Sequence, residues 1–353
     1  MEKTPKITII DVARRAGVSK GTVDRVLHNR GEVAAASAEK VRKAVEELGY
    51  EPNLYASLLA TRRDRVIALL LPRFETGEYW EKIHDGFIHG GEEVANLGVR
   101  TEAFLYDQYD PASFTAACAA LLDSHPSGVV LAPLFLEETS DFVSRLHGSG
   151  IPYVYVDSKL EDDNHFAYFG MPMYKSGHLC ACLLTERCGA GEVDEIAIAR
   201  ITRDRTRQSD PTVSRRAGFI DYISSKFPSC RMHNVFLNPS DPKSVDETLE
   251  RFFSEHPGIR FVVMFNSRVH LLARYLVSHP LAGRRVIGFD DLEKNMDMLK
   301  AGLVDILIAQ HTENLSRLAV STLTDFLLMH KEPARRDNYM HMDILTRFNE
   351  ENY

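Results

Sequence analysis

Residues 20–25 carry side chains of the types that contact DNA bases. Lys20, Thr22 and Arg25 can donate hydrogen bonds, and Gly21 and Asp24 lie between them. An arginine guanidinium can bond to both O6 and N7 of guanine. Because Gly21 has no side chain, selectivity at that position would depend on close approach of the backbone or on a neighbouring residue. The group is therefore suited to reading the edge of a base pair.

Three short helices are expected to position these residues. Thr8 and Asp11 predict the start of the first helix, and Gly17 predicts its end and a sharp turn. Ser19 is a good N-cap for the second helix, and residues 38–48 predict a third with apolar positions on one face. This pattern is typical of a helix-turn-helix, whose second helix presents its N-terminal part outward. The alternative is a small helical bundle without a nucleic-acid partner.

The distribution of charge supports a nucleic-acid partner only weakly. Residues 1–63 contain twelve Lys and Arg against eight Asp and Glu, whereas residues 64–353 contain 30 against 42. A small basic segment joined to a large acidic one is typical of a DNA-binding module fused to another domain. It also occurs as an ordinary solvated surface.

The first fifty residues resemble a known family. The segments IIDVARRAGVSKGTVDRVLHN, from residue 9, and EKVRKAVEELGYEPN, from residue 39, are similar to the DNA-binding head of the lactose-repressor (LacI) family. The resemblance implies base contacts by Lys20, Gly21 and Arg25. It also implies phosphate or backbone contacts by Thr8, Ser19, Thr22 and Asn53. In the same resemblance, Tyr50 would pack near the DNA.

Three positions depart from the family pattern. Asp24 replaces the usual Ser, and it would pair with Lys20 or Arg25 or accept from a cytosine amino group. Ala34 replaces the Ser that caps the third helix, a loss of about 1 kcal/mol, and Ala38 replaces a common Arg. The number of phosphate contacts, and with it the salt dependence of binding, therefore stays open.

A short amphipathic segment, residues 53–63, follows Pro52. A helix of this length is marginal on its own. The resemblance implies a hinge helix that folds on the DNA against its dimer mate, with Ala56 allowing close approach and Leu59 wedging into the minor groove. Alternatively, Leu58 and Leu59 are linker residues that pack on the rest of the chain.

From residue 66 onward, apolar runs rich in β-branched residues alternate with helical patterns. The strands are predicted at 66–71, 128–132, 152–156, 195–198, 260–265 and 284–288, and the helices at 81–97, 111–125, 138–148, 175–187, 213–226, 244–256 and 268–279. Such alternation predicts an α/β body of parallel sheets with helices on both faces. The number of units favours two lobes, with a ligand cleft at the carboxyl ends of the strands.

Residues 65–353 are similar to the sugar-binding, periplasmic-binding-protein-like core of the same family, most closely at Ile287-Gly288-Phe289-Asp290-Asp291. The resemblance implies ligand contacts by Asp290, Asn266 and Arg215. Independently of the resemblance, an ionised carboxylate can accept hydrogen bonds from two adjacent hydroxyls of a polyol. The alternative role for Asp290 is to cap a helix that starts near residue 292.

Further candidates follow two other predicted strands. Asp157 ends the strand at 152–156, and Phe74, Tyr79 and Trp80 follow the strand at 66–71, where an aromatic ring could stack on a sugar. Core packing is the alternative for Trp80. Basic residues near the expected cleft would favour an acidic or phosphorylated sugar, or would be solvated loop charges; they are Lys159, Lys175, Arg203, Arg205, Arg207 and Arg215.

Catalytic and metal-binding motifs are not found in the sequence. Cys180 and Cys182 point to different sides of a predicted helix, and together with Cys188 they do not complete four zinc ligands. Asp290 and Asp291 are adjacent and point apart, which is a poor arrangement for glycoside hydrolysis. We therefore expect no enzymatic activity, no cofactor and no metal site.

The sequence thus predicts an all-α helix-turn-helix domain (1–51), a hinge (52–64) and a two-lobed α/β effector domain (65–353). The lobes are expected at about 65–168 with 298–330, and 169–297 with 331–353. We expect a repressor of transcription that binds double-stranded DNA at a near-palindromic operator as a homodimer and responds to a sugar-like small molecule. The alternatives are a sugar-binding receptor and a sugar-processing enzyme with an accessory DNA-binding head.

Composition and the start of the chain predict the location. No apolar run approaches the ~18 residues of a membrane span, and no export signal is visible. The five cysteines show no paired framework, as in proteins of a reducing compartment. A cytosolic protein without membrane contact is therefore expected.

Overall fold

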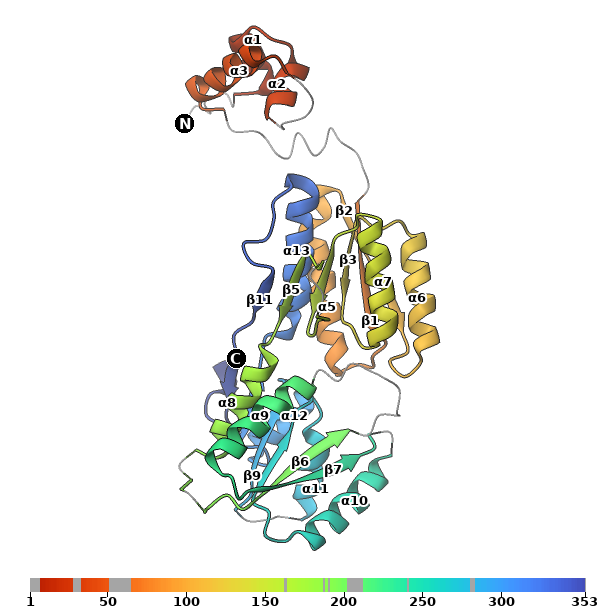
Figure 1. Ribbon diagram of the computed structural model, residues 1–353, viewed down its shortest axis with the longest axis vertical. Coiled ribbons are helices and arrows are strands. Elements are labelled where there is room, and N and C mark those ends of the chain that lie inside the picture. The colour runs from red at the N-terminus through yellow and green to blue at the C-terminus, as the bar shows by residue number, and fades with distance from the viewer. Residues whose placement is uncertain are drawn as a thin grey trace. The chain divides into compact units, whose positions relative to one another are not determined.

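The chain folds into two compact units, Met1–Asp64 and Arg65–Tyr353, here called the head and the body (Figure 1). The computed structural model describes residues 7–27, 33–50, 65–161, 164–186, 188–189, 191–201, 212–239, 241–279 and 283–352. None of the helices in these ranges has both the length and the apolar composition that crossing a membrane requires.

The head contains α1 (Ile9–Ala16), α2 (Lys20–Leu27) and α3 (Ala35–Leu48). The backbone N–H and the hydroxyl of Thr8 donate to the carboxylate of Asp11 at 2.9 and 2.6 Å, which confirms the predicted start of α1. Gly17 ends α1 with a left-handed φ of 67°, a conformation that favours glycine. One valine from each helix is fully buried, and together they form the centre of the core: Val12, Val23 and Val41.

The amino end of α3 has no side-chain cap, because Ala34 occupies the N-cap position and its side chain cannot accept a hydrogen bond. The helix begins at Ala35, three residues earlier than predicted. We expect Ala34→Ser to stabilise α3 by ~1 kcal/mol, since a serine hydroxyl can accept from an N–H of the first turn. Hydrogen exchange of the α3 amides in the full chain should become slower.

The exposed Ala36 in the first turn of α3 provides the matched control. Ala36→Ser adds the same hydroxyl where it cannot cap the helix, so exchange should not slow there. If both variants exchange at the rate of the parent, the first turn of α3 does not depend on a cap.

The body contains two six-stranded sheets. The first has the order β11-β5-β4-β3-β1-β2, and every pair of neighbours in it is parallel. Seven of the eight residues of its β1 strand are buried, because helices cover both faces of the sheet. The strands are β1 (Arg65–Pro72), β2 (Val99–Tyr106), β3 (Gly128–Leu131), β4 (Tyr153–Val156), β5 (Ala167–Gly170) and β11 (Asp337–Tyr339).

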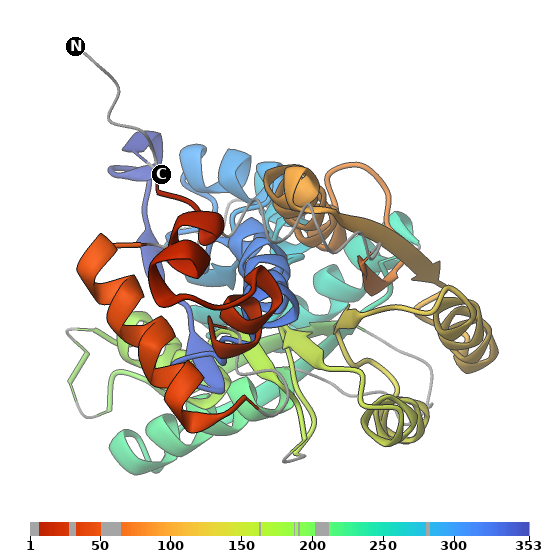
Figure 2. The ribbon, with the colours of Figure 1, turned by 90° about the horizontal axis from the view of Figure 1, so that it is seen from above.

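Four helices cover the first sheet, two on each face. Figure 2 shows α5 (Tyr79–Val94) and α13 (Thr312–Met329) side by side on one face, and α6 (Pro111–Asp123) and α7 (Leu136–Gly148) on the other. The short helix η1 (Ala95–Leu97) extends α5. The strands of the first sheet and all four of these helices contribute to one continuous apolar core.

The second sheet has the order β12-β10-β9-β8-β6-β7, with only β12 antiparallel to its neighbour. Its strands are β6 (Glu195–Ile201), β7 (Arg231–Leu237), β8 (Phe261–Met264), β9 (Arg285–Phe289), β10 (Ile306–Ala309) and β12 (Asp343–Leu345). One face packs on α8 (Met173–Leu184) and α9 (Thr212–Lys226). The other packs on α10 (Pro242–Glu255), α11 (His270–Ser278) and α12 (Glu293–Lys300), and η2 (Glu350–Asn352) lies near the end of the chain.

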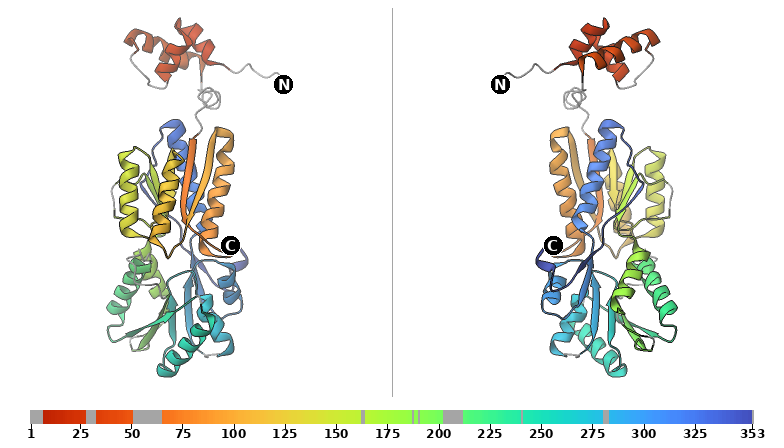
Figure 3. Two further views of the ribbon diagram at one scale, coloured as in Figure 1. Left: turned by 90° about the vertical axis from the view of Figure 1, so that its right-hand side faces the viewer. Right: turned by 90° about the vertical axis from the view of Figure 1, so that its left-hand side faces the viewer.

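The chain crosses between the sheets more often than a two-domain protein with one linker would (Figure 3). It leaves the first sheet after β5, returns through α13 after β10, and crosses again between β11 and β12. The predicted lobe ranges were therefore wrong near the C-terminus. Strand β10 belongs to the second lobe, because its apolar run pairs with β9, and the short polar strand β11 belongs to the first, because it pairs with β5.

Candidate functional site

Helix α2 presents an exposed polar and basic surface. Lys20, Gly21 and Arg25 are exposed. The Ser19 hydroxyl accepts a hydrogen bond from the backbone N–H of Thr22 at 3.1 Å, as its predicted N-cap role requires. Nε of Arg25 donates to the carbonyl oxygen of Gly21 at 3.2 Å. This bond fixes the stem of the arginine, and the terminal guanidinium nitrogens are the atoms that a guanine would engage.

The other residues predicted to contact DNA have different settings. Thr8 is exposed, and its hydroxyl is engaged at the start of α1. Tyr50 is only 8% exposed and packs in the core of the head, so the structure gives it a packing role there. Asn53, Ala56 and Leu59 of the expected hinge lie outside the described residues.

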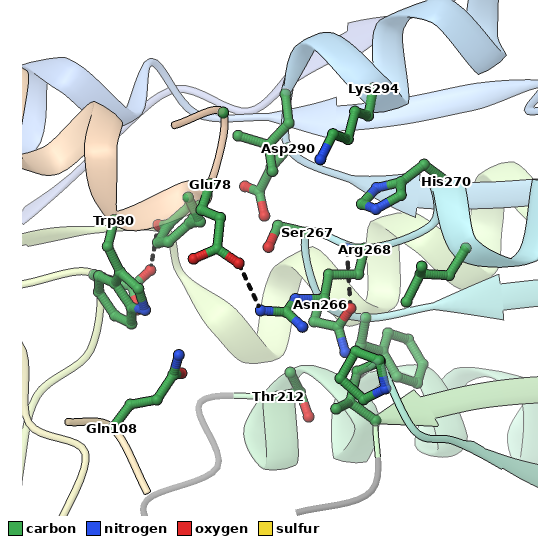
Figure 4. Close-up of a pocket in the computed structure, with 18 of the residues that line it drawn as sticks. Glu78, Trp80, Gln108, Thr212, Asn266, Ser267, Arg268, His270, Asp290 and Lys294 are labelled. Atoms are coloured by element: carbon green, nitrogen blue, oxygen red, sulfur yellow. Dashed lines mark hydrogen bonds and ion pairs between the residues drawn. The ribbon is translucent and has the colours of Figure 1, made fainter. Parts of the chain in front are cut away.

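A pocket of about 260 Å³ lies in the body at the carboxyl ends of the strands of both sheets (Figure 4). One water occupies about 30 Å³ in the liquid, so the pocket has room for a small organic molecule. The first lobe lines it with Gly77, Glu78, Tyr79, Trp80, Gln108, Tyr109 and Asp157. The second lobe lines it with Met173, Ile201, Thr212, Arg215, Pro239, Phe265, Asn266, Ser267, Arg268, His270, Leu271, Asp290, Leu292, Lys294 and Gln310.

Six of the seven residues predicted to contact a ligand meet in this pocket: Tyr79, Trp80, Asp157, Arg215, Asn266 and Asp290. Phe74 does not line it. Its ring packs against the core of the first lobe, with its centroid 5.2 Å from that of the His84 imidazole. The position of Phe74 soon after β1 therefore did not predict a pocket contact. The chain turns after Phe74, and the lining of the pocket begins only at Gly77.

Two aspartates occupy matching positions in the two lobes. Asp157 follows β4 and Asp290 follows β9, and both are buried. Both have a left-handed backbone, with φ of 66° and 67°, which is strained for residues other than glycine and is often found at functional sites. The backbone N–H of Asp157 donates to the carbonyl oxygen of Phe169 in the neighbouring strand at 3.0 Å. The backbone N–H of Asp290 donates in the same way to the carbonyl oxygen of Ile308, also at 3.0 Å. The sheets thus hold both carboxylates at the pocket.

Asp290 has an unusual electrostatic setting. Burial raises its pKa to about 7, although the Arg215 guanidinium favours the ionised form. Its Oδ1 atom is buried and has no hydrogen-bond partner among the described residues, and the same holds for Oε1 of Gln310. Figure 4 shows the Asp290 carboxyl group directed into the pocket. Two such acceptors in one cavity are complementary to a ligand that brings hydroxyl donors.

Tyr79 connects the two lobes at the base of the pocket. Its hydroxyl donates to Oδ1 of Asp157 at 2.5 Å and accepts from Nε2 of Gln310 at 3.0 Å. Burial raises the pKa of Tyr79 well above its usual range, so the hydroxyl keeps its proton. The Trp80 ring meets the Tyr79 ring edge to face at 5.2 Å, and Trp80 also packs in the core. Both interpretations of Trp80, pocket lining and core packing, therefore describe it.

Arg215 is buried, and the second lobe holds its guanidinium. Nε donates to Oγ of Ser176 at 3.0 Å, Nη1 donates to the carbonyl oxygen of Phe265, and the group lies 3.8 Å from the centroid of the Phe289 ring. Helices α8 and α9 approach closely here because Gly177 has no side chain. A Cβ at this position would overlap the carbonyl oxygen of Arg215. This packing fixes a positive charge beside Asp290.

Two ion pairs join the lobes near the pocket. Glu78 and Arg268 approach to 3.2 Å, and Lys82 and Asp291 approach to 2.6 Å. The backbone N–H of Arg268 also donates to Oδ1 of Asn266 at 3.0 Å, so one of the predicted ligand residues orders the loop after β8 (Figure 4). These pairs stabilise the observed spacing of the lobes.

Sequence reasoning missed several polar lining residues: Glu78, Gln108, Ser267, Arg268, His270, Lys294 and Gln310. Gln310 follows β10, a strand that was not predicted, although the apolar run at 306–309 was the available signal. The basic residues expected near the cleft are placed differently. Lys159 pairs with Asp337 at 2.5 Å, Lys175 is exposed, and neither lines the pocket. Arg203, Arg205 and Arg207 lie outside the described residues.

Two family models match most of the chain. Residues 8–53 match the model described as bacterial regulatory proteins, lacI family, and residues 67–331 match the periplasmic binding protein domain. A solved structure, described as a putative LacI transcriptional regulator from Bacteroides fragilis, is 33% identical with a TM-score of 0.78. That match covers 82% of this chain and 100% of the other.

Curated relatives match over shorter segments. The transcriptional regulator CelR of Thermobifida fusca is 32% identical over 44% of this chain and 45% of its own length. The regulator AscG of Escherichia coli is 31% identical over 65% of this chain and 63% of its own length. The chain thus spans less than two thirds of either relative. GanP, a glucose-galactose binding protein from Geobacillus stearothermophilus, is 16% identical with a TM-score of 0.68 and shares the fold of the body.

Proposed function

Because the chain belongs to the LacI family of bacterial regulatory proteins and has a periplasmic-binding-protein-like body, we propose that it regulates transcription. It binds a specific DNA sequence through α2 and a small effector through the pocket of the body. It acts as a homodimeric repressor on a near-palindromic operator, since the twofold symmetry of a dimer is mirrored in the DNA it reads.

The effector is a polyhydroxylated, sugar-like molecule. The observation that carries this proposal is the pair of buried acceptors without donors, Oδ1 of Asp290 and Oε1 of Gln310, in a cavity that also contains the Trp80 ring. A sugar supplies adjacent hydroxyls for such acceptors and an apolar ring face for an aromatic side chain. Among the basic groups of the lining, Arg268 pairs with Glu78, Arg215 lies beside Asp290, and burial lowers the pKa of His270 and favours its neutral form. Lys294 also lines the pocket, so uronates and sugar phosphates belong in the test beside neutral sugars.

The two sites are coupled through the spacing of the lobes. An effector that contacts both Asp157 and Asp290 binds best at one spacing, and the ion pairs between Glu78 and Arg268 and between Lys82 and Asp291 favour the observed one. A ligand shifts such an equilibrium only by its difference in affinity for the two states. The effector therefore changes operator affinity by changing which spacing is populated.

Footprinting of the full chain on the region upstream of its own gene tests this proposal. We expect one protected, near-palindromic site with half-sites one helical turn apart or a multiple of it. A thermal-shift screen of monosaccharides, uronates and sugar phosphates should identify ligands, and those ligands should change the footprint. Sedimentation should show a dimer. Absence of any protected site, with and without each compound, would contradict the regulatory function.

The same screen separates the two alternatives. A sugar-binding receptor would bind a sugar with no effect on any footprint. A sugar-processing enzyme would convert the compound, which product analysis after long incubation would detect. The relatives reported above with at least 30% identity are regulators, not enzymes.

A further inference from the structure

Three side chains of types that can ligate a metal ion lie together at the opposite end of the second sheet from the pocket. Glu195 is the first residue of β6, His233 is the third residue of β7, and His256 ends α10. Each offers one ligand atom, and these three atoms lie within 4.8 Å of one another. Strand β6 ends at the pocket-lining Ile201, six residues further on, so about 20 Å of extended chain separates the two sites.

The three residues already contact one another. Nε2 of His233 lies 3.2 Å from Oε1 of Glu195, and the His233 and His256 ring centroids are 4.2 Å apart. The parallel register pairs Glu195 with Arg231 and Ala197 with His233, which places His233 diagonally across from Glu195 on the two adjacent strands. All three are only partly exposed, so a bound ion would be shielded on one side and open to water on the other.

We propose that Glu195, His233 and His256 form a binding site for a divalent transition-metal ion of the zinc class. Two imidazoles and one carboxylate are donors that zinc accepts, and a water completes a tetrahedron. With bonds of ~2.0–2.2 Å, donor atoms on one zinc lie roughly 3–3.5 Å apart. His233 and Glu195 already meet this spacing at 3.2 Å, and because all three donors lie within 4.8 Å, His256 must move closer by at most roughly 1.3–1.8 Å. The ion would join the edge strand β7 to β6 and α10. This inference does not rest on the proposed function.

Arg231 makes the proposal sharply testable. Its Nη2 lies 2.8 Å from the same Glu195 oxygen that faces His233, and its side chain is 73% exposed. The guanidinium therefore competes with a metal ion for the carboxylate. Removing it should tighten metal binding, whereas removing a ligand should weaken it. If Glu195, His233 and His256 only hydrogen-bond to one another and bind no metal, neither substitution would change metal affinity.

The probe is Zn²⁺ alone, added to the full chain without a polyhistidine tag after treatment with a chelator and reductant, with a chromophoric chelator as competitor. We expect one equivalent bound per chain, with affinity at least ~10-fold lower in His233→Ala, in His256→Ala and in Glu195→Gln. Arg231→Ala should bind more tightly than the parent. Zn²⁺ should raise the unfolding temperature of the parent and not that of the ligand variants.

Two controls keep the result interpretable. His89→Ala removes an exposed histidine on α5 and should bind Zn²⁺ like the parent. Co²⁺ substitution distinguishes this site from adventitious binding at the five cysteines, because a His₂Glu site gives no thiolate charge-transfer band. Melting curves without metal identify any variant that fails to fold, and Glu195→Gln, the most conservative change, then decides. Equal affinity in parent and ligand variants, or thiolate bands, would overturn the proposal.

Discussion

Replacing Asp290 by asparagine is expected to reduce effector affinity by about a hundredfold or more. Two adjacent hydroxyls of the effector would each lose a hydrogen bond to a charged group, and such a bond contributes roughly 1.5–3 kcal/mol. The amide has nearly the shape of the carboxyl group, so the loss reports charge rather than a cavity. Oδ1 of Asp290 is one of two buried acceptors without a donor among the described lining residues, and the other, Oε1 of Gln310, belongs to a neutral amide.

The same substitution should have the opposite effect on stability. Burial raises the pKa of Asp290 to about 7 in the folded protein, against ~3.9 in an unfolded chain. The folded state therefore binds the extra proton between these values, and the stability that depends on this group falls as pH rises from about 4 to about 7. Asparagine stays neutral throughout. Asp290→Asn should match the parent near pH 4 and exceed its stability at pH 8 by roughly 1–4 kcal/mol.

Urea unfolding at pH 4 and pH 8 without effector, together with calorimetric titration of the screening hits, measures both effects. Effector affinity of the parent should rise with pH up to about 7 and then level, since ionised Asp290 accepts the hydroxyls. Asp246→Asn, on the exposed face of α10, is the matched control and should change neither quantity. A variant that binds every hit as tightly as the parent would show that Asp290 does not contact the effector.

The head could be predicted from sequence because its signals are local. Thr8, Asp11 and Gly17 determine where α1 starts and ends through contacts within one helical turn. The exposure of Lys20 and Arg25 then follows from the helical periodicity of Val23 and Val26. Tyr50 was harder, because its burial depends on the packing of three helices rather than on its neighbours in sequence.

The body shows where sequence reasoning ends. Asp157 was found because it follows a strongly apolar strand, and the carboxyl ends of parallel strands meet at one edge. Asp290 was found through the resemblance of residues 287–291 to a family signature. Strands with mixed or polar composition, such as β7 and β11, carry no clear pattern, and β11 was assigned to the wrong lobe. The apolar strand β10 was also assigned to the wrong lobe, because its pairing with β9 cannot be read from its own residues. The Glu195, His233 and His256 cluster could not be seen, since the strand register and the end of α10 bring together residues far apart in the chain.

The ion pairs between the lobes could not be predicted for a related reason. Lys82 and Asp291 lie 209 positions apart, and their approach to 2.6 Å depends on the spacing of the two lobes. Such pairs are sensitive to that spacing, because the interaction between charges falls steeply once water enters between them. They are thus suited to a state that an effector can favour or disfavour.

In the head, Arg25→Ala is expected to weaken binding to the specific operator by ~1–3 kcal/mol and to leave binding to unrelated DNA nearly unchanged. Arg25 is exposed on α2, and its bond to the Gly21 carbonyl oxygen holds the stem so that the guanidinium can bond bidentately to a guanine. Arg25→Lys keeps the charge but not the fork, so it should lose most of the same specificity.

The salt dependence decides whether Arg25 reads a base or only contacts a phosphate. A lost phosphate contact lowers the slope of log affinity against log salt concentration by about 1 and weakens all sequences alike, whereas a lost base contact leaves that slope nearly unchanged. Arg42→Ala is the matched control, because this exposed arginine on α3 pairs with Glu39 at 3.3 Å and lies outside α2. Fluorescence anisotropy on operator and scrambled duplexes at several salt concentrations makes the comparison. If Arg25→Ala lowers affinity for both duplexes equally and flattens the slope, α2 contacts the DNA backbone at this position, and sequence must be read by Lys20 and its neighbours.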